Sequence, residues 1–285
     1  MIMQAPAKIN LGLDVLCRRP DGYHEVDMIM QTIDLFDTVT IEKSEKPGIE
    51  LSTNKPELPN DEGNLAYKAA KLLFETCGEK ESGVRIHIEK RIPMAAGLAG
   101  GSTDCAAVLS GMNTLFSFGL SMERLMELGK TLGADVPYCL LQGTARSQGI
   151  GEKLTPLPKM MCCPVLIAKP GVAVSTKAVY EGLRLDEATA HPDIDALESD
   201  IRRQDLAALA KDMGNLLATV TEELHPVIKE IRALMEAHGA LRAMMSGSGP
   251  TVFGLFSDMK TAQEAEAAMR DANLAPDVCL TSISE

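Results

Sequence analysis

Residues 93–104 read Pro-Met-Ala-Ala-Gly-Leu-Ala-Gly-Gly-Ser-Thr-Asp. Three glycines lie within five positions, and two hydroxyl side chains follow them. Glycine costs about 0.5–1 kcal/mol relative to alanine inside a helix or strand. The cluster therefore predicts a tight turn where a ligand approaches the backbone. The alternating residues 84–89 before it predict a strand, and the apolar residues 106–109 after it predict a helix that Ser102 or Thr103 caps.

A strand, a glycine-rich loop and a helix N-terminus in this order favour an anion site. Backbone N–H groups point outward there, and the helix end carries about half a positive charge. A nucleotide phosphate is the usual occupant. The loop fits neither the Walker A pattern nor Gly-x-Gly-x-x-Gly, because its glycines are Gly97, Gly100 and Gly101. A tight connection without a ligand is the alternative reading of the spacing alone.

The rest of the chain interleaves strand and helix patterns, which predicts an α+β protein. Residues 8–15 alternate strictly and predict a half-buried strand whose polar face carries Lys8, Asn10, Gly12 and Asp14. Asn64 and Ser121 are each expected to start a helix. Helical periodicity covers about 196–237, and 244–256 predicts two strands joined by a glycine turn. A Gly- and Pro-rich stretch near 150–170 marks a domain boundary, which gives 1–158 and 159–285.

Composition limits the partners. The formal net charge is −12, which argues against nucleic acid, because duplex binding relies on Lys and Arg. Seven cysteines without a Cys-x-x-Cys pair argue against a zinc ribbon or a disulfide scaffold. The N-terminus has no signal-peptide pattern, and the longest apolar stretch is too short to cross a membrane. We therefore expect a cytoplasmic protein, with its oligomeric state left open.

Three motifs in order carry a family resemblance. Residues 93–103 resemble the phosphate loop of the GHMP kinases, which include galactokinase, homoserine kinase and mevalonate kinase. Pro6-Ala-Lys-Ile-Asn-Leu-Gly-Leu13 is similar to the N-terminal strand motif of that family, and Ser246-Gly-Ser-Gly-Pro-Thr-Val-Phe253 to its C-terminal glycine motif. The family's usual loop has Gly where this chain has Ala95, Ala96 and Ala99. The resemblance implies two α+β domains, an N-terminal one like ribosomal protein S5 domain 2 and a ferredoxin-like C-terminal one.

The resemblance also implies ATP and Mg²⁺ as cofactors. Asn64 resembles an adenine-side contact, with an ordinary helix cap as the equal alternative. The Mg²⁺ ligands stay unassigned, and Ser102 is the better candidate than Asp104 for a contact to metal or phosphate. The expected ATP-binding run is Pro93, Met94, Ala95, Ala96, Gly97, Leu98, Ala99, Gly100, Gly101, Ser102 and Thr103.

Catalytic roles follow from the same resemblance. Asp135, in Leu132-Gly-Ala-Asp-Val-Pro137, would accept the proton of the acceptor hydroxyl. Lys8 would keep that carboxylate ionised and face the transferring phosphoryl group. Without the resemblance, Asp135 is a turn residue and Lys8 a solvated lysine.

The acceptor side rests on Asp21-Gly-Tyr-His24, which resembles the family members whose acceptor is a cytidine diphosphate methylerythritol. Asn10, Tyr23, His24, Thr176 and Tyr180 are the expected contacts to this small-molecule substrate. Two alternatives stay open. One is a GHMP kinase that acts on homoserine, mevalonate or a sugar, and the other is a nucleotide-binding regulator without catalysis.

Overall fold

The computed structural model describes residues 1–79, 82–186 and 189–283. The chain forms two compact units, which are described separately. The first unit comprises Met1–Ala7, Leu35–Met94 and Ala99–Gln142, and the second comprises Lys8–Asp34, Ala95–Leu98 and Gly143–Glu285. Strands β1 (Ile2–Arg18) and β2 (His24–Ser44) therefore each contribute to both units. Within the described residues, no helix has the length and hydrophobicity needed to cross a membrane.

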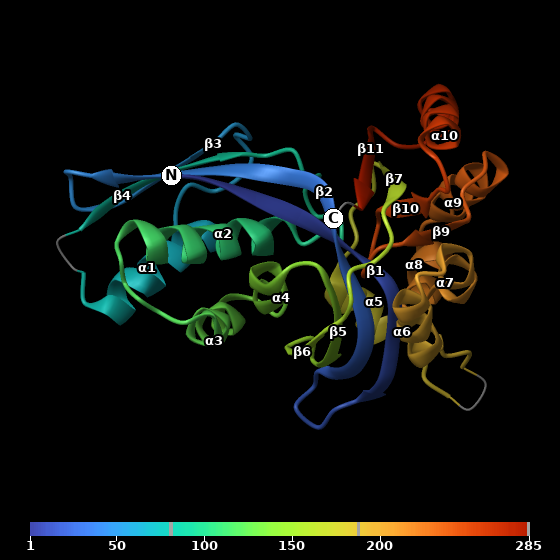
Figure 1. Ribbon diagram of the computed structural model, residues 1–285, viewed down its shortest axis with the longest axis horizontal. Helices are drawn as coiled ribbons and strands as arrows, with labels where there is room; N and C mark the ends of the chain where they lie inside the picture. Colours follow the sequence, from blue (N-terminus) through green and yellow to red (C-terminus); the bar gives the residue numbers. More distant parts are fainter. Residues whose placement is uncertain (80–81, 187–188, 284–285) are drawn as a thin grey trace. The chain divides into compact units, whose positions relative to one another are not determined.

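In the first unit, helices pack on a sheet. The end of β2 pairs antiparallel with β4 (Gly83–Glu89), and β3 (Gly48–Thr53) pairs parallel with β4. Helices lie against one face of these strands (Figure 1). They are α1 (Leu65–Cys77), α2 (Gly100–Leu115), α3 (Met122–Leu132) and α4 (Val136–Leu141).

The core of the first unit follows the sequence pattern. Val84, Ile86 and Ile88 on β4 are fully buried, whereas Arg85 and His87 between them are exposed. The predicted strand is therefore confirmed. The helix predicted after Asn64 is also present, because the Asn64 side chain accepts a hydrogen bond from the N–H of Ala66 and caps α1. Ser121 caps α3 in the same way.

The second unit contains an antiparallel sheet in the order β11-β7-β10-β9. Helices α9 and α10 pack on it (Figure 1). The strands of this unit are β5 (Thr144–Gly149), β6 (Lys153–Pro156), β7 (Cys163–Lys169), β8 (Gly214–Asn215), β9 (Arg242–Met245), β10 (Val252–Leu255) and β11 (Asp277–Ile283). Its helices are α5 (Thr176–Gly182), α6 (Ile194–Arg203), α7 (Leu206–Asp212), α8 (Ala218–Leu224), α9 (Val227–Ala237) and α10 (Met259–Ala272).

Strand β1 differs from its prediction, because both of its faces are buried. Lys8 is 5% exposed, Asn10 1% and Asp14 4%. A side chain on Gly12 would come within 2.4 Å of Leu197 on α6, so this helix covers the polar face directly. The polar groups are accommodated by pairing, as buried polar groups require. Lys8 donates to the side chain of Asn10, and Asp14 lies 2.7 Å from the ring nitrogen of His191.

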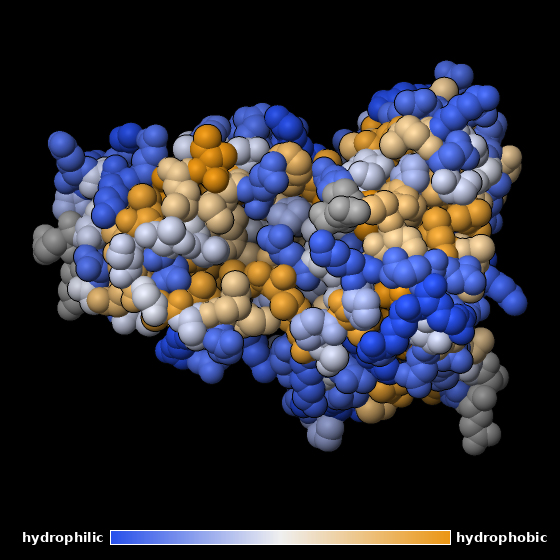
Figure 2. Space-filling view, viewed as in Figure 1, coloured by the Kyte–Doolittle hydropathy of each residue, from blue (hydrophilic) through white to orange (hydrophobic). Residues whose placement is uncertain are grey.

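The α+β class predicted from the sequence is confirmed by these sheets and helices. On the face shown in Figure 2, hydrophilic and hydrophobic residues are interspersed. This is the surface expected of a chain in which 24% of the residues are charged.

Candidate active site

The first glycine segment (residues 93–101) follows β4 and leads into α2. Ala95, Gly97 and Ala99 all have positive φ, at 49°, 73° and 59°. The helix begins at Gly100, with Ala99 in the N-cap position. The prediction that Ser102 or Thr103 caps α2 is therefore wrong. The left-handed turn at Ala99 starts the helix three residues earlier, so that the N–H of Thr103 already donates to the carbonyl of Ala99, at 2.9 Å.

This start leaves the first turn of α2 with outward N–H groups. Orphan N–H groups at the N-terminus of a helix of 16 residues form an anion site. Ser102 lies in that turn and is partly exposed, whereas Thr103 is 1% exposed. Within the described residues, the hydroxyl of Thr103 has no hydrogen-bond partner. The geometry of the segment therefore suits a phosphate, with Ser102 as the accessible hydroxyl.

The second glycine segment (residues 246–250) contacts the first one. The Ser246 hydroxyl donates to the carbonyl of Gly97 at 3.0 Å. A Cβ on Gly97 would come within 2.4 Å of the Ser246 carbonyl oxygen. Gly97 therefore has to be glycine, both for its positive φ and for this close approach. The two motifs, which lie about 150 residues apart in the sequence, meet backbone to backbone in the second unit.

Lys8 and Asn10 lie beside the second glycine segment. The Lys8 Nζ atom donates to Asn10 Oδ1 at 2.7 Å. A Cβ on Gly247 would be 3.5 Å from Lys8 Nζ and 3.6 Å from Asn10 Oδ1. The N–H of Lys8 also donates to the carbonyl of Leu98, at 3.1 Å. The second unit thus brings Lys8 and Asn10 together with both glycine segments.

Asp135 belongs to the first unit and occupies the N-cap position of α4. The turn before it lies beside the start of α2, because a Cβ on Gly133 would be 3.8 Å from the Ser102 hydroxyl. Helices α2 and α4 pack against each other. The turn that carries Asp135 and the first turn of α2, with Ser102, are therefore neighbours in one unit.

His24 and Tyr180, two of the predicted acceptor contacts, form a ring pair. Their centroids are 4.9 Å apart, and the rings are tilted by 31°. Burial, together with the neighbouring charge of Arg18, lowers the pKa of His24, which favours the neutral imidazole near neutral pH. Tyr23 is 60% exposed, so its ring is accessible to a ligand. Thr176 reaches the second glycine segment, since its hydroxyl is 2.8 Å from that of Ser248.

A buried charge cluster was not predicted from the sequence. Lys90, directly after β4, donates from Nζ to Asp37 and, at 2.7 Å, to Asp104 on α2. All three side chains are buried. Asp37 Oδ1 also accepts from the N–H groups of Arg91 and Ile92. The cluster thereby joins the residues on either side of the first glycine segment, and its bond to Lys90 occupies one carboxylate oxygen of Asp104.

Burial is the largest influence on Asp104. It raises the pKa of this carboxyl to about 7, against the opposing attraction of the Lys90 ammonium, and the negative charge of Asp37 adds to the rise. Asp104 Oδ1 is buried without a hydrogen-bond partner in the described part of the chain. No signal in the sequence marks the cluster, because Lys90 and Asp37 lie 53 residues apart.

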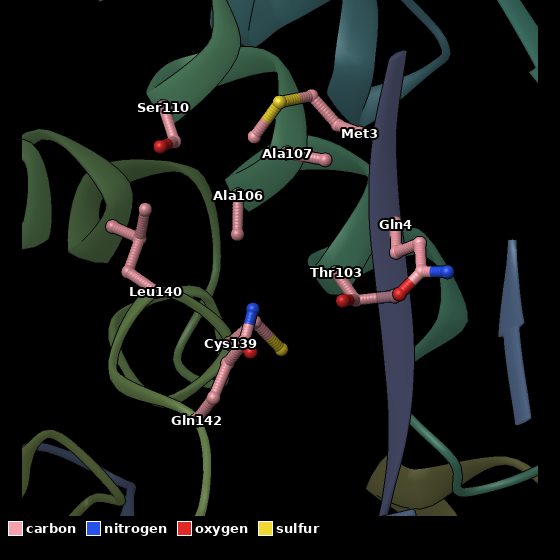
Figure 3. Close-up of a pocket in the computed structure, with 9 residues that line it drawn as sticks. All are labelled: Met3, Gln4, Thr103, Ala106, Ala107, Ser110, Cys139, Leu140 and Gln142. Carbon is pink, nitrogen blue, oxygen red and sulfur yellow. The ribbon is translucent and has the colours of Figure 1, made fainter. Parts of the chain in front are cut away.

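A pocket of about 50 Å³ lies in the first unit near this helix. Figure 3 shows it between β1, α2 and α4. It is lined by Met3, Gln4, Thr103, Ala106, Ala107, Ser110, Cys139, Leu140 and Gln142. Pockets for drug-sized ligands measure roughly 300–1,000 Å³, so this one has room for water and not for a nucleotide. Thr103 is the one predicted site residue that lines it.

Both ends of the Asn64 side-chain amide are hydrogen-bonded at the start of α1. Its amide nitrogen donates to the carbonyl of Pro59, and its oxygen caps α1. This favours the helix-cap reading, and the adenine contact stays a prediction. Among residues 1–79, 82–186 and 189–283, no group of three His, Cys, Asp or Glu side chains is arranged to hold a metal.

Two domains of one protein family match this chain, and known kinases match nearly all of it. Residues 64–143 match the GHMP kinases N-terminal domain, and residues 197–274 match the GHMP kinases C-terminal domain. The 4-diphosphocytidyl-2-C-methyl-D-erythritol kinase of Lachnoclostridium phytofermentans is 54% identical over 92% of this chain and 90% of its own length. The chain belongs to the GHMP kinase family. The kinase of the same name from Lachnospira eligens is 49% identical over 98% of this chain and 96% of its own length.

The fold agrees with that membership. The crystal structure of a 4-(cytidine 5′-diphospho)-2C-methyl-D-erythritol kinase superposes with a TM-score of 0.86 at 35% identity, and the match covers all of both chains. A homoserine kinase from Cytophaga hutchinsonii gives a TM-score of 0.78 at 22% identity, over 99% of this chain and 92% of that chain. At that identity the likeness concerns the fold alone. The two-domain GHMP kinase fold predicted from the motifs is confirmed.

Proposed function

We propose that this chain transfers the γ-phosphoryl group of ATP to the 2-hydroxyl of 4-diphosphocytidyl-2-C-methyl-D-erythritol. The products are the 2-phosphate and ADP, a step of the non-mevalonate isoprenoid precursor pathway. The observation that carries the proposal is the 54% identity, over 92% of the chain, to a kinase named for this acceptor. The paired rings of His24 and Tyr180 support it, because a cytosine ring needs aromatic neighbours and hydrogen-bonding groups.

The first glycine segment would hold the phosphates of ATP. The run from Pro93 to Thr103 leads into α2, whose first N–H groups face an anion. Mg²⁺ commonly reaches a protein through one or two ligands and the substrate phosphates. The Ser102 hydroxyl is the side chain that fits this need, since Asp104 is bonded to Lys90. When bound, the metal would neutralise charge on the phosphates.

Lys8 and Asp135 would carry the chemistry. Asp135 would accept the proton of the 2-hydroxyl as it attacks the γ-phosphorus. The Lys8 ammonium would favour the ionised carboxylate and face the transferring phosphoryl oxygens. Phosphoryl transfer depends mainly on positioning and charge stabilisation, so these two groups, the backbone amides and a bound Mg²⁺ would be sufficient.

The acceptor would lie against residues of the second unit. We assign Tyr23, His24 and Tyr180 to the cytosine ring, with Asn10 and Thr176 on the same substrate. Asn64 remains the proposed contact near the adenine of ATP. Residues 1–158 and 159–285 remain our proposed domains, and the cytoplasm our proposed location.

The reaction is tested by measuring ADP release from ATP and Mg²⁺ with different acceptors. The assay compares the diphosphocytidyl methylerythritol, homoserine, mevalonate and no acceptor. Release that depends on the cytidyl acceptor supports the proposal. Release with homoserine or mevalonate instead contradicts the roles of Tyr23 and His24. ATP binding without release in any assay indicates a nucleotide-binding regulator.

The base assignment is tested by Asp135→Asn. A general base contributes about 10²–10⁴-fold, so the variant is expected to lose that factor in kcat and still bind a fluorescent ATP analogue. Asp205→Asn is the matched control, since Asp205 caps α7 and asparagine is an equally good cap. A kcat of Asp135→Asn within threefold of the control would show that Asp135 is not the base.

A further inference from the structure

The turn between β9 and β10 is the part of the second unit that contacts both Lys8 and the first glycine segment. Ser246 bonds to the Gly97 carbonyl, and Gly247 lies against the Lys8–Asn10 pair. Gly247 and Gly249 both have positive φ, at 58° and 88°. A displaced turn would therefore disturb the proposed phosphate loop and the proposed catalytic lysine together.

An amide side chain from outside the turn helps to hold it, together with the Thr221 hydroxyl, which donates to the Ser248 carbonyl. Asn215 Nδ2 donates to the carbonyl of Met245 and to the carbonyl of Gly247, both at 2.8 Å. Its Oδ1 atom accepts the N–H of Leu217 at 3.0 Å. These three bonds account for both amide protons and the oxygen, so the orientation of the amide is fixed. A side chain that spans residues 245 and 247 sets the path of the turn between them.

Asn215 is itself in register with the strand that carries Lys8. Strand β8 pairs parallel with β1 at Gly12–Gly214 and Leu13–Asn215. The N–H of Leu216 continues this pairing by donating to the carbonyl of Leu13 at 2.9 Å. Asn215 thus connects β1 to the turn that lies against Lys8 on the same strand.

We infer that Asn215 is a positioning residue for phosphoryl transfer, which acts by holding the second glycine segment against Gly97 and Lys8. The inference rests on the proposed function of these two residues. Asn215 touches neither ATP nor acceptor in this role. It acts through the backbone of Met245 and Gly247, whose carbonyls need an N–H donor.

Asn215→Asp is the decisive variant, because it is nearly isosteric and keeps the acceptor for Leu217 but replaces both donors with a carboxylate oxygen. Asn113→Asp is the matched control. Asn113 is equally half-buried, donates to the Leu120 carbonyl and accepts the Leu120 N–H. It lies 13 residues along α2 from Gly100, about 20 Å at 1.5 Å per residue. Both variants add the same charge; Asn215→Asp removes two bonds to carbonyls and Asn113→Asp removes one.

The measurements are the unfolding midpoint, kcat and KM for ATP, and the affinity for a fluorescent ATP analogue. A positioning role predicts that Asn215→Asp lowers kcat/KM for ATP at least tenfold relative to Asn113→Asp at a similar unfolding midpoint. Equal kcat/KM values in the two variants would overturn the inference. If Asn215→Asp does not fold, Asn215→Ala is judged against Asn113→Ala by the same criterion.

The inference and the proposed function can fail separately. A wild-type protein that releases no ADP with the cytidyl acceptor refutes the proposed function. In that case, the affinity for the ATP analogue still tests Asn215. A weaker affinity in Asn215→Asp than in Asn113→Asp supports the positioning role, and equal affinities refute it.

Discussion

The two glycine segments have similar backbone turns but differ in the residues that form them. Each makes a left-handed turn that places backbone groups close to a neighbour. The second segment has glycine at its positive-φ positions 247 and 249, whereas the first has alanine at two of its three, Ala95 and Ala99. Alanine in the left-handed region costs roughly 1–2 kcal/mol. The first segment is therefore strained where the second is relaxed.

The anchors of the two segments differ as well. Neutral groups hold the second, namely the Asn215 amide and the Thr221 hydroxyl, which donates to the Ser248 carbonyl. A buried ammonium between two carboxylates closes the ends of the first. Buried charges depend on every partner being present. The first segment should therefore be the more sensitive to substitution and to pH.

The largest effect is expected from Lys90→Met. Removing the cation leaves Asp37 and Asp104 buried together, which costs about 3–5 kcal/mol in the free energy of unfolding. Urea unfolding at pH 8 measures it. Lys46→Met is the control, since Lys46 is exposed in a turn and should change stability by less than about 0.5 kcal/mol. Equal losses in the two variants would show that the cluster does not anchor the segment.

Gly97→Ala should disrupt the close contact between the two glycine segments. The new Cβ would meet the Ser246 carbonyl oxygen at 2.4 Å, and φ at this position is +73°. Strain and overpacking together predict a loss of about 2–4 kcal/mol and a weaker affinity for ATP. In Gly101→Ala the Cβ meets only Leu65, at 3.8 Å. That variant should be as stable as the wild type or more so, and an equal loss in both would contradict the close contact.

Local signals in the sequence predicted the elements well. Asn64 and Ser121 cap helices because a side chain and the N–H group two or three residues later are all that a cap requires. Glycine spacing likewise located both glycine segments, and alternation located β4. These features depend on neighbours within a few residues, which a single sequence displays.

Features made by distant residues were missed. The polar face of β1 is buried because α6 covers Gly12, and α6 lies about 180 residues further along the chain. The start of α2 at Ala99 was missed because Ser and Thr are preferred over Ala as N-cap residues, which pointed to Ser102 or Thr103. Nothing in the sequence near Lys90 distinguishes it from a solvated lysine, because its partners Asp37 and Asp104 come together with it only in the fold.

The pH dependence of the free energy of unfolding should reveal the titration of the Asp104 carboxyl. Its pKa is raised to about 7 in the folded protein, against about 3.9 in an unfolded chain. The folded state therefore holds more protons between these values, and the free energy of unfolding falls as pH rises through this window. The charged groups that face Asp104 are Lys90 and Asp37.

Asp104→Asn removes this titration. Its stability relative to the wild type should rise by on the order of 2 kcal/mol between pH 5 and pH 8. Urea unfolding at the two pH values measures the difference. Asp258→Asn is the control, because hydrogen bonds from the backbone and side chain of Thr261 lower the pKa of Asp258. This carboxyl is ionised in the folded and the unfolded protein at both pH values, so the difference for Asp258→Asn should not change between them. A pH-independent difference for Asp104→Asn would show that this carboxyl stays ionised throughout.

The smallest expected effect tests the strain in the first segment directly. Ala99 has φ 59° and sits at the N-cap of α2, where glycine is the better residue on both counts. Ala99→Gly relieves roughly 1–2 kcal/mol of backbone strain and loses about 0.4–1 kcal/mol through the freer unfolded chain. The net result should be a gain of about 0–1.6 kcal/mol.

Ala96→Gly is the matched control, since Ala96 is buried and does not have positive φ in the described chain. Glycine there gives up the buried methyl group and frees the unfolded chain, so that variant should lose about 1 kcal/mol. If Ala99→Gly destabilises the protein as much as Ala96→Gly does, the left-handed alanine stores no strain, and the two glycine segments differ in their anchors alone.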